Sequence, residues 1–454
     1  MKRHLTTVLL ASLALLNLAT ESVPKIYMCP ECGCASDAVV FGKPGNCPSC
    51  GMVLVEAKDR HEVEMRAMQP VASLHFPEGK KSVTFPFELI ANGIYLPMRV
   101  NGKGPFAFEL DTGSFNSIVA SELAVEMGIQ TTGTTTGSGA GSGSFVAGKI
   151  KELSFEFPEG VTASTRAGTS VSMAGLWPLI ARRMYGDIGH DVIQYCVVQI
   201  DYEKKLLTLH DPASYHYNGK AQAIPFTLWG SYDPQIDGEV IVDGETPIPV
   251  KFTLDTGAGG TAITTPLVEA HHLREKVGKV LPAFDNGAGG GEAKLVTARL
   301  AALRIGPYRI NQPLVALTND TQGSFASKTL GVNLGANILK RFTVIIDYSR
   351  KQLILEPNAH LEDSFKADAS GLVLKAGADN FRVFTVRALV PDSPATEAGI
   401  QPGDRLTAID GDPLDNYALW QVQELLQKAG TSCQLSVERG DKRFTATLNL
   451  RSLL

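Results

Sequence analysis

The sequence has no excess of positive charge. Its 42 Lys and Arg residues are outnumbered by 47 Asp and Glu residues, which leaves a formal net charge of −5. A nucleic-acid-binding protein usually carries a strongly basic surface, so the charge balance argues against this class of function. Beyond the N-terminus, no apolar run reaches the ~18 residues that a membrane-spanning helix needs. The sequence therefore predicts no nucleic-acid partner and no transmembrane segment after removal of a signal peptide.

Two common catalytic signatures are also missing. The stretch Gly139-Ala-Gly-Ser-Gly143 fails the Gly-x-Ser-x-Gly pattern of a nucleophile elbow at its central position. The chain has two Gly-rich runs, Gly137–Gly143 and Gly287–Gly291. Neither run ends in Lys-Ser or Lys-Thr, as a phosphate-binding loop does. Serine-hydrolase catalysis and nucleotide binding therefore have no support in the sequence.

The composition is that of a globular protein with several cores. Apolar residues make up 44% and charged residues 20% of the 454 residues, and a prior of about one domain per 150 residues suggests roughly three domains. The 44 glycines indicate many turns, as in a β-rich protein. Lys2 and Arg3 precede an apolar stretch from Val8 to Leu16, the layout of a secretory signal over residues 1–20. We expect an exported protein, periplasmic or extracellular; an uncleaved anchor is the alternative.

Four of the seven cysteines form two closely spaced pairs. Cys29-x2-Cys32 and Cys47-x2-Cys50 are separated by 14 residues, and paired knuckles of this kind place four thiolates around Zn²⁺. Exported cysteines also oxidise readily, so disulfides remain the alternative. Residues 25–57 resemble the small heavy-metal-binding module of bacterial envelope proteins, which implies a zinc-ribbon-like accessory site. The charged residues 58–80 are interpreted as a linker.

The middle of the chain repeats itself. Phe106-Ala-Phe-Glu-Leu-Asp111-Thr-Gly-Ser114 aligns with Val250-Lys-Phe-Thr-Leu-Asp255-Thr-Gly-Ala258, and Asp187-Ile-Gly189 aligns with Asn333-Leu-Gly335 at nearly the same spacing. Two anchors at nearly one offset indicate a duplicated lobe. We place lobe 1 at residues 81–213 and lobe 2 at 220–358, both built from β-strands.

The repeated Asp-Thr-Gly triplet carries the candidate chemistry. Each Asp follows an apolar strand, and Gly113 and Gly257 are expected to let the backbone bend. If the two copies pack about a pseudo-twofold axis, Asp111 and Asp255 meet. Two carboxyls ~3 Å apart share one proton, so one can activate a water while the other protonates a carbonyl oxygen.

With these motifs, residues ~82–358 resemble a bacterial retropepsin-like aspartic protease with both lobes fused in one polypeptide. The resemblance implies that Asp111 and Asp255 form the catalytic dyad, that no cofactor takes part, and that Thr112 and Thr256 brace the two turns by hydroxyl hydrogen bonds. It also implies that Ser114 orients its Asp, which Ala258 cannot do. The flaps of the family correspond to the two Gly-rich runs, with Gly139, Gly141, Gly289 and Gly290.

A third pattern follows residue 370. Ser393-Pro-Ala leads to Ala398-Gly-Ile, and Gly403-Asp404 marks the turn into the next strand. Residues 370–452 thereby resemble a PDZ domain of the bacterial protease-associated kind. The resemblance implies that Gly371, Leu372 and Val373 bind the carboxylate of a peptide C-terminus, which adds as a strand; a PDZ-like spacer without ligand is the alternative.

The sequence as a whole predicts a mainly β protein with two acid-protease lobes in tandem, a PDZ domain and a Cys-rich module. The favoured function is that of an exported aspartic endopeptidase acting on polypeptide substrates. The alternatives are an inactive peptide-binding or metal-responsive envelope adaptor, and a homodimer in which lobes pair between chains.

Overall fold

The protein divides into two compact units, Met1–Met68 and Gln69–Leu454. The computed structural model describes residues 25–29, 39–48, 51–57, 72–141, 143–166, 168–243, 246–286, 292–377 and 380–454. In the described part of the first unit, three two-residue strands form a sheet in the order β2-β1-β3: β1 (Tyr27–Met28), β2 (Val40–Phe41) and β3 (Val55–Glu56). Cys29 and Cys47 are buried together with Leu54. The predicted signal peptide, Cys32 and Cys50 lie outside the described residues.

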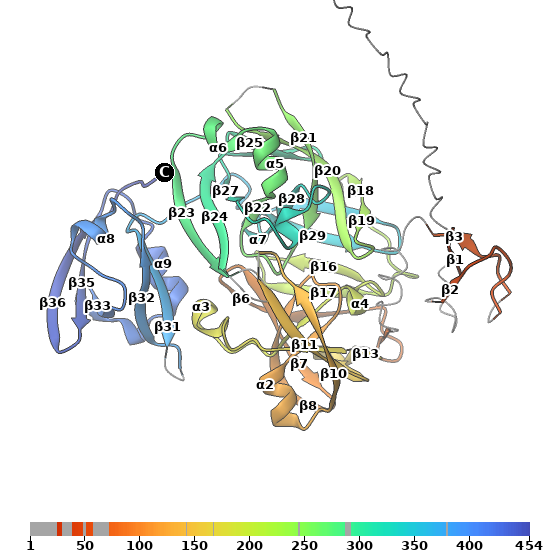
Figure 1. Cartoon of the computed structure of the whole chain (residues 1–454). Helices are drawn as coiled ribbons and strands as arrows, with labels where there is room; N and C mark the ends of the chain where they lie inside the picture. The colour runs from red at the N-terminus through yellow and green to blue at the C-terminus, as the bar shows by residue number, and fades with distance from the viewer. Residues whose placement is uncertain are drawn as a thin grey trace, which may run out of the picture. The chain divides into compact units, whose positions relative to one another are not determined.

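Lobe 1 is built on an 11-stranded sheet (Figure 1). Its order is β10-β11-β14-β9-β15-β8-β7-β12-β13-β4, with β6 paired to β7. The strands are β4 (Ala72–His75), β6 (Glu88–Ile90), β7 (Gly93–Val100), β8 (Lys103–Leu110), β9 (Ile118–Ala120), β10 (Thr131–Ser138), β11 (Ser144–Ile150), β12 (Leu153–Glu156), β13 (Thr162–Thr165), β14 (Gly168–Val171) and β15 (Gly186–Ile188). The helical segments are α2 (Ser121–Met127), η1 (Pro158–Gly160), α3 (Trp177–Ile180) and α4 (His190–Ile193).

Lobe 2 repeats this pattern in a 10-stranded sheet. Its order is β23-β24-β27-β22-β28-β21-β20-β25-β26, with β19 paired to β20. The strands are β19 (Thr227–Trp229), β20 (Asp233–Ile241), β21 (Ile248–Leu254), β22 (Thr261–Ile263), β23 (Val280–Asn286), β24 (Glu292–Arg299), β25 (Ala302–Ile305), β26 (Tyr308–Asn311), β27 (Leu314–Thr318) and β28 (Val332–Leu334). The helical segments are α5 (Thr265–Ala270), α6 (Leu273–Lys276), η2 (Ser324–Ala326) and α7 (Ala336–Leu339).

The duplication is visible in the strand pairing. In lobe 1, β15 runs parallel to β8 and antiparallel to β9. In lobe 2, β28 runs parallel to β21 and antiparallel to β22. The two Asp-Thr-Gly motifs therefore follow equivalent strands, β8 and β21, in sheets of the same local topology.

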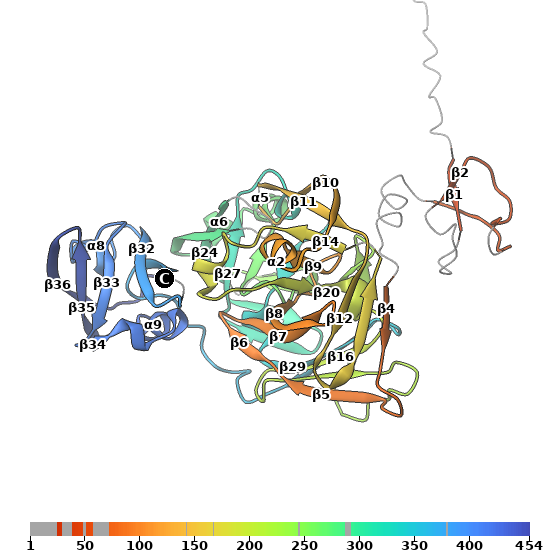
Figure 2. The same cartoon turned by 90° about the horizontal axis from the view of Figure 1, so that it is seen from below.

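A third sheet joins the lobes. Its six strands run in the order β18-β30-β29-β16-β17-β5, and the pairing of β16 with β29 crosses from one lobe to the other, with Ile200 opposite Val344. Figure 2 shows β5, β16 and β29 on the same side of the lobes. The strands are β5 (Ser82–Pro86), β16 (Val197–Asp201), β17 (Leu206–His210), β18 (Ala223–Pro225), β29 (Phe342–Asp347) and β30 (Gln352–Pro357).

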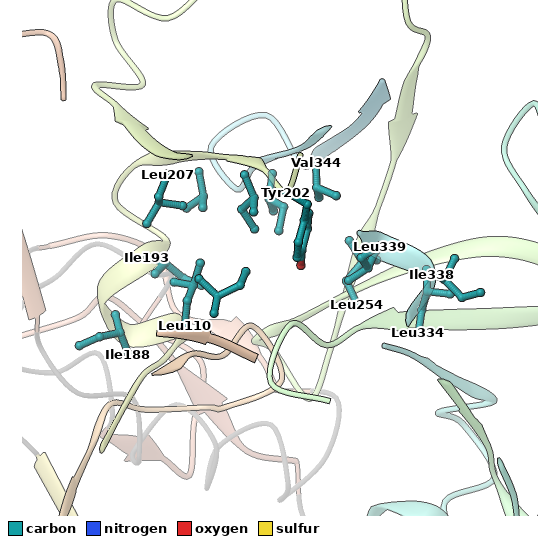
Figure 3. Packing of buried hydrophobic residues seen from close by; sticks show 14 of the residues in the cluster. Leu110, Ile188, Ile193, Tyr202, Leu207, Leu254, Leu334, Ile338, Leu339 and Val344 are labelled. Atoms are coloured by element: carbon teal, nitrogen blue, oxygen red, sulfur yellow. The ribbon is translucent and has the colours of Figure 1, made fainter. Parts of the chain in front are cut away.

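One hydrophobic core spans both lobes. Strands β8 and β21 alternate, so Phe108 and Leu110, like Phe252 and Leu254, are fully buried on one face. Figure 3 shows Tyr202 between Leu110, Ile188 and Ile193 on one side and Leu254, Leu334, Ile338 and Leu339 on the other. Because this core is continuous, the two lobes are held as one body.

Strand β4 corrects the boundary of the predicted linker. It pairs with β13, and the hydroxyls of Ser73 and Ser164 are 3.0 Å apart. Leu74 packs on the core of the lobes. The segment 72–75 therefore belongs to lobe 1, and its short length and mixed polarity explain why no strand was predicted there.

The C-terminal domain has its own core and sheet. Its strand order is β31-β32-β33-β35-β36, with β34 paired to β33. The elements are β31 (Leu372–Gly377), β32 (Val383–Leu389), α8 (Pro394–Glu397), β33 (Arg405–Ile409), β34 (Asp412–Pro413), η3 (Leu414–Asn416), α9 (Leu419–Leu425), β35 (Ser432–Arg439) and β36 (Lys442–Asn449). The mainly β fold predicted from the sequence is confirmed. Across the residues described, no helix is both long enough and apolar enough to cross a membrane.

Candidate active site

The two Asp-Thr-Gly turns meet between the lobes. Each Asp leaves the end of its strand and is anchored by the strand alongside: the N–H of Asp111 donates to the carbonyl of Ile188 (3.0 Å), and that of Asp255 to Leu334 (3.1 Å). The N–H groups of the residues after Gly189 and Gly335 close the loops from behind, donating to the carbonyls of Ser114 and Ala258. In each lobe, the segment around Gly189 or Gly335 therefore holds the Asp-Thr-Gly turn in place.

The threonines brace the turns across the lobe boundary. The Thr112 hydroxyl donates to the Leu254 carbonyl at 2.7 Å and accepts the N–H of Thr256 at 3.1 Å. The Thr256 hydroxyl does the same with the Leu110 carbonyl (2.6 Å) and the N–H of Thr112 (3.1 Å). Both threonines are fully buried, so these bonds are shielded from water. The cross-bracing that the resemblance implies is present within a single chain, and the lobes need no second molecule to pair.

The glycines of the triplets have a different role from the one expected. Neither Gly113 nor Gly257 has a positive φ. Instead, a β-carbon on Gly113 would lie 2.7 Å from Cγ of Asp255, and one on Gly257 would lie 2.5 Å from Cγ of Asp111. Glycine is needed because each turn receives the carboxyl group of the other lobe, and a side chain would keep the two carboxyls apart.

The two carboxyls are hydrogen-bonded to each other and differ in their other partners. Asp255 accepts the N–H of Ala258 (2.9 Å) and the side-chain amide of Asn333 (2.7 Å). Asp111 accepts the N–H of Gly113 (2.9 Å). Burial, and then the negative charge of Asp255, raises the pKa of Asp111 well above its usual range. The pair is therefore arranged to keep one proton, with Asp111 as its holder.

Ser114 does not orient its Asp. Its hydroxyl donates to the carbonyl of Asn116 at 2.9 Å, because the turn directs the side chain along the loop rather than back toward the carboxyl. The side chain that hydrogen-bonds to the Asp255 carboxyl is instead that of Asn333, on β28. The internal repeat aligns Asn333 with Asp187 in the sequence, but the hydrogen bond from Asn333 to Asp255 was not predicted.

Further carboxyl groups surround the pair. Burial, followed by the charges of Asp187, Asp111 and Asp255, raises the pKa of Glu109 well above its usual range. Burial, and then the charge of Asp255, raises the pKa of Asp187 to about 7. Asp233 is likewise buried near both central carboxyls, and its pKa is raised chiefly by that burial. These three residues were not predicted as site residues.

The hairpins expected to be flaps are present as β10–β11 and β23–β24. The carbonyls of Gly139 and Ala140 at the tip of the first hairpin accept the N–H groups of Ser324 (3.2 Å) and Phe325 (3.0 Å) of lobe 2. This tip therefore bridges the lobes, and Gly141 beside it is buried. Gly289 and Gly290 of the second hairpin lie outside the described residues.

The candidate peptide loop of the C-terminal domain is occupied from within. The N–H of Gly371 donates to the Asp368 carboxylate (2.5 Å), and the N–H of Leu372 to the Ser370 hydroxyl (3.0 Å). Val373 pairs with Ala388 of β32. β31 stands at the edge of its sheet, but α3 packs against it, so a peptide strand that added there would meet α3. Of the amides expected to receive a peptide carboxylate, that of Gly371 therefore already binds an internal carboxylate, and that of Leu372 binds a hydroxyl.

The comparisons with known proteins agree with this architecture. A family model described as aspartyl protease matches residues 96–157 and 238–337, and a PDZ domain model matches residues 385–439. The two segments matched by the aspartyl protease model each contain one of the Asp-Thr-Gly turns.

Individual relatives share shorter stretches. The chain is 36% identical over 83 residues to a probable CtpA-like serine protease of Staphylococcus haemolyticus (17% of each chain), and 39% identical over 69 residues to a putative zinc metalloprotease of Neisseria meningitidis (15% of each). It is 26% identical over 129 residues to the periplasmic serine endoprotease DegP of Salmonella typhimurium, which is 27% of this chain and 25% of that protein. The chain thus spans less than a third of these relatives, and their names carry different catalytic types. The family models and the fold together show an aspartyl-protease-like domain followed by a PDZ domain.

Proposed function

We propose that the protein is an exported aspartic endopeptidase. The observation that carries the proposal is the pair Asp111 and Asp255, which are hydrogen-bonded to each other at the meeting point of two equivalent turns. Two carboxyls that share a proton supply both a base and an acid without a covalent intermediate. A polypeptide is the substrate class that such a pair hydrolyses.

The unequal hydrogen bonds assign the roles at the start of the reaction. Asp255 accepts two hydrogen bonds besides the one from its partner, so its carboxylate is the better stabilised anion. In the proposed mechanism Asp255 takes a proton from the attacking water, and Asp111 donates its proton to the carbonyl oxygen of the scissile bond. As the C–N bond breaks, Asp255 passes the water-derived proton to the leaving amine, and a hydroxyl of the collapsing gem-diol returns its proton to Asp111, which restores the starting pair.

The pair also predicts the pH dependence of turnover. Activity requires one proton on the two carboxyls, so it is expected to follow a bell-shaped profile on the acidic side. A rate that stays flat to alkaline pH would count against the shared proton.

Selective inhibitors separate this proposal from the catalytic types named in the relatives. Peptide cleavage by the full chain should be blocked by a statine-type transition-state analogue, and it should resist a serine-directed fluorophosphonate and a metal chelator. Inhibition by the fluorophosphonate or the chelator, but not by statine, would overturn the aspartic assignment. A folded protein that binds peptides without cleaving any would be an adaptor.

The N-terminal module is proposed to bind zinc through Cys29, Cys32, Cys47 and Cys50. The burial of Cys29 and Cys47 in one cluster supports this, since ligands far apart in the chain come together. Purified protein should then carry about one zinc per chain, and a chelator should release it. Oxidised cysteines without metal would favour disulfides instead.

The PDZ domain is proposed to bind a peptide C-terminus along β31. The PDZ domain would then deliver polypeptide ends to the protease lobes.

An exported location is supported by the signal-like N-terminus and by similarity to a relative named as periplasmic.

A further inference from the structure

The loops that follow the two Asp-Thr-Gly triplets are held in different ways. In lobe 1 the loop is anchored by its own side chains: the Ser114 hydroxyl donates to the Asn116 carbonyl at 2.9 Å, and the Asn116 amide donates to the Thr169 hydroxyl. In lobe 2 the corresponding residues 258–260 read Ala-Gly-Gly. Such side chains form no hydrogen bonds, so the lobe 2 loop depends on anchors from other parts of the chain.

One of these anchors comes from the hairpin between β6 and β7 of lobe 1. Asn92, in the turn of this hairpin, donates from its side-chain amide to the carbonyl of Gly259 at 2.8 Å. A β-carbon on Gly259 would lie 2.9 Å from the carbonyl oxygen of Ala91. Glycine at position 259 therefore lets the turn come close enough for the hydrogen bond.

The hairpin between β19 and β20 makes the equivalent contact in the opposite direction. Tyr232, at the end of its turn, packs edge-on against Phe115 of lobe 1, with the ring centroids 5.5 Å apart. Phe115 follows Asp111 by four residues, as Gly259 follows Asp255. Each lobe thus holds the loop behind the other lobe's Asp, one through an aromatic contact and the other through a hydrogen bond.

Lys340 fixes the orientation of the Asn92 amide. Its Nζ donates to Oδ1 of Asn92 at 2.9 Å. A lysine ammonium carries donors and no acceptor, so the oxygen of the amide faces Lys340 and the NH2 group faces Gly259. Lys340 directly follows α7, whose first residue, Ala336, donates its N–H to the Ala258 carbonyl at 2.8 Å. The end of one short helix therefore holds the loop both directly and through Asn92.

The held loop supports the charged form of Asp255. The N–H of Ala258 donates to the Asp255 carboxyl at 2.9 Å, and a hydrogen bond to the ionised form of an acid favours that form. Glycine has more backbone freedom than any other residue. Without the bond from Asn92 to Gly259, the loop would sample more conformations, and the Ala258 N–H would spend less time on the carboxylate.

We propose that Asn92, oriented by Lys340, is a positioning residue that holds the loop 258–260 and thereby keeps Asp255 as the charged member of the dyad. The inference rests on the proposed function and adds the residues that maintain the base. An amide side chain does not titrate, so the bond to Gly259 persists across the acidic range in which turnover is expected.

The test measures kcat/KM against pH for the full-length wild type and Asn92→Gly. Glycine suits the φ of 70° at position 92, so the substitution removes the side chain without straining the turn. The lower limb of the profile, where the pair gains its second proton, should move up by about one pH unit, the size expected for one weakened hydrogen bond to a charged group. An unmoved limb overturns the proposal.

Two variants of Lys340 separate orientation from charge. Lys340→Met and Lys340→Gln remove the same charge, but glutamine keeps an N–H donor for Asn92, so the limb should move less in Lys340→Gln than in Lys340→Met. Equal movement would mean that the charge acts, and not the orientation of Asn92. The other titratable groups that act on Lys340 stay in place: Arg341, Asp363 and Glu424. So do those that interact with Asp255: Glu109, Asp111, Asp187, Tyr202, Tyr232 and Asp233.

Asn101→Gly is the matched control. Asn101 lies in the turn at the other end of β7, also at a positive φ of 46°, and its Oδ1 accepts the N–H of Ser154 at 2.9 Å. This variant also loses a side-chain hydrogen bond of a lobe 1 turn, but both limbs of the profile should stay in place. An equal shift in Asn101→Gly would assign the effect to a general loss of stability and overturn the positioning role.

A measurement without substrate separates the proposal from the proposed function. The side-chain carboxyl signals of ¹³C-aspartate-labelled protein are followed by NMR against pH, with Asp111→Asn and Asp255→Asn used for assignment. Uptake of the second proton by the pair should occur about one pH unit higher in Asn92→Gly than in wild type or Asn101→Gly. An unshifted transition refutes the positioning role, whether or not peptides are cleaved. A shifted transition in a protein that cleaves no peptide refutes the proposed function alone.

Discussion

A β-carbon on Gly257 would lie 2.5 Å from Cγ of Asp111. The same holds across the pseudo-twofold axis for Gly113 and Asp255, at 2.7 Å. The glycines of the two triplets are thus a steric requirement of the carboxyl pair rather than of the turn.

This relationship predicts the effect of a single methyl group. Gly257→Ala should push the Asp111 carboxyl away and lower kcat/KM at least about 100-fold, since a misplacement near 1 Å costs about this much. Peptide cleavage with thermal unfolding as a folding check measures it. Gly260→Ala is the matched control, because a β-carbon there meets nothing within 4 Å. Equal activity of the two variants would contradict the steric account.

The bracing threonines predict a stability effect. Thr112→Val leaves the Leu254 carbonyl and the Thr256 N–H without their partner, which should lower the free energy of unfolding by about 1–3 kcal/mol for each buried group. Thr112→Ser keeps the hydroxyl and should lose only about 1 kcal/mol for its methyl group. Urea unfolding of the three proteins gives both values. If serine is no better than valine, the cross-brace is not what stabilises the turns.

The buried acid Asp187 predicts a fall in stability with rising pH. Its pKa is raised from 3.8 to about 7 in the folded protein, so between these values the folded state binds more protons than the unfolded state. Its contribution is present below about pH 4 and is lost as pH rises toward 7. His190 acts in the opposite direction, because burial lowers its pKa to about 4. Glu109, Asp111 and Asp255 are the charged neighbours that act on this site.

Asp187→Asn should therefore flatten the decline in unfolding free energy between pH 4 and pH 7, measured in urea at several pH values. Asp237→Asn, whose side chain is 84% exposed, should keep the wild-type slope. An unchanged slope in Asp187→Asn would show that this carboxyl does not hold a proton in the folded state.

The internal carboxylate of the PDZ domain predicts weak peptide binding. Asp368 accepts the N–H groups of Ser370 and Gly371, so a peptide C-terminus must compete with it. Asp368→Ala should tighten binding of C-terminal peptides, measured by fluorescence anisotropy, about tenfold, the worth of one charge-assisted hydrogen bond. Asp363→Ala, on an exposed residue that pairs with His360, is the control. Weaker binding in Asp368→Ala would mean that this carboxylate builds the loop instead of blocking it.

Much of the fold follows from local patterns in the sequence. The alternation of Phe108 and Leu110 with polar residues marks β8, and the same pattern marks β21. The repeat then places Asp111 and Asp255 at equivalent strand ends, which predicts their meeting without any long-range information. Strand β4 escaped because its four residues carry no clear period and depend on pairing with β13.

The surroundings of the dyad were less accessible to sequence reasoning. Glu109 lies two residues before Asp111, so strand alternation is enough to place both on one face, but Glu109 was not predicted as a site residue. The partner of Ser114 and the internal carboxylate Asp368 depend on loop geometry, which the sequence does not encode in a simple period. Asp187 and Asn333 occupy aligned positions in the repeat. Only the strand register shows that Asp187 lies beside Glu109 and Asn333 beside Thr253.

The central claim is that Asp111 and Asp255 act as one catalytic unit. Turnover of a peptide mixture by wild type, Asp111→Asn and Asp255→Asn, each checked for a native melting transition, tests it most directly. The account predicts that either substitution removes turnover while the protein stays folded, because a single carboxyl cannot be both base and acid. Full activity in either folded variant would contradict it.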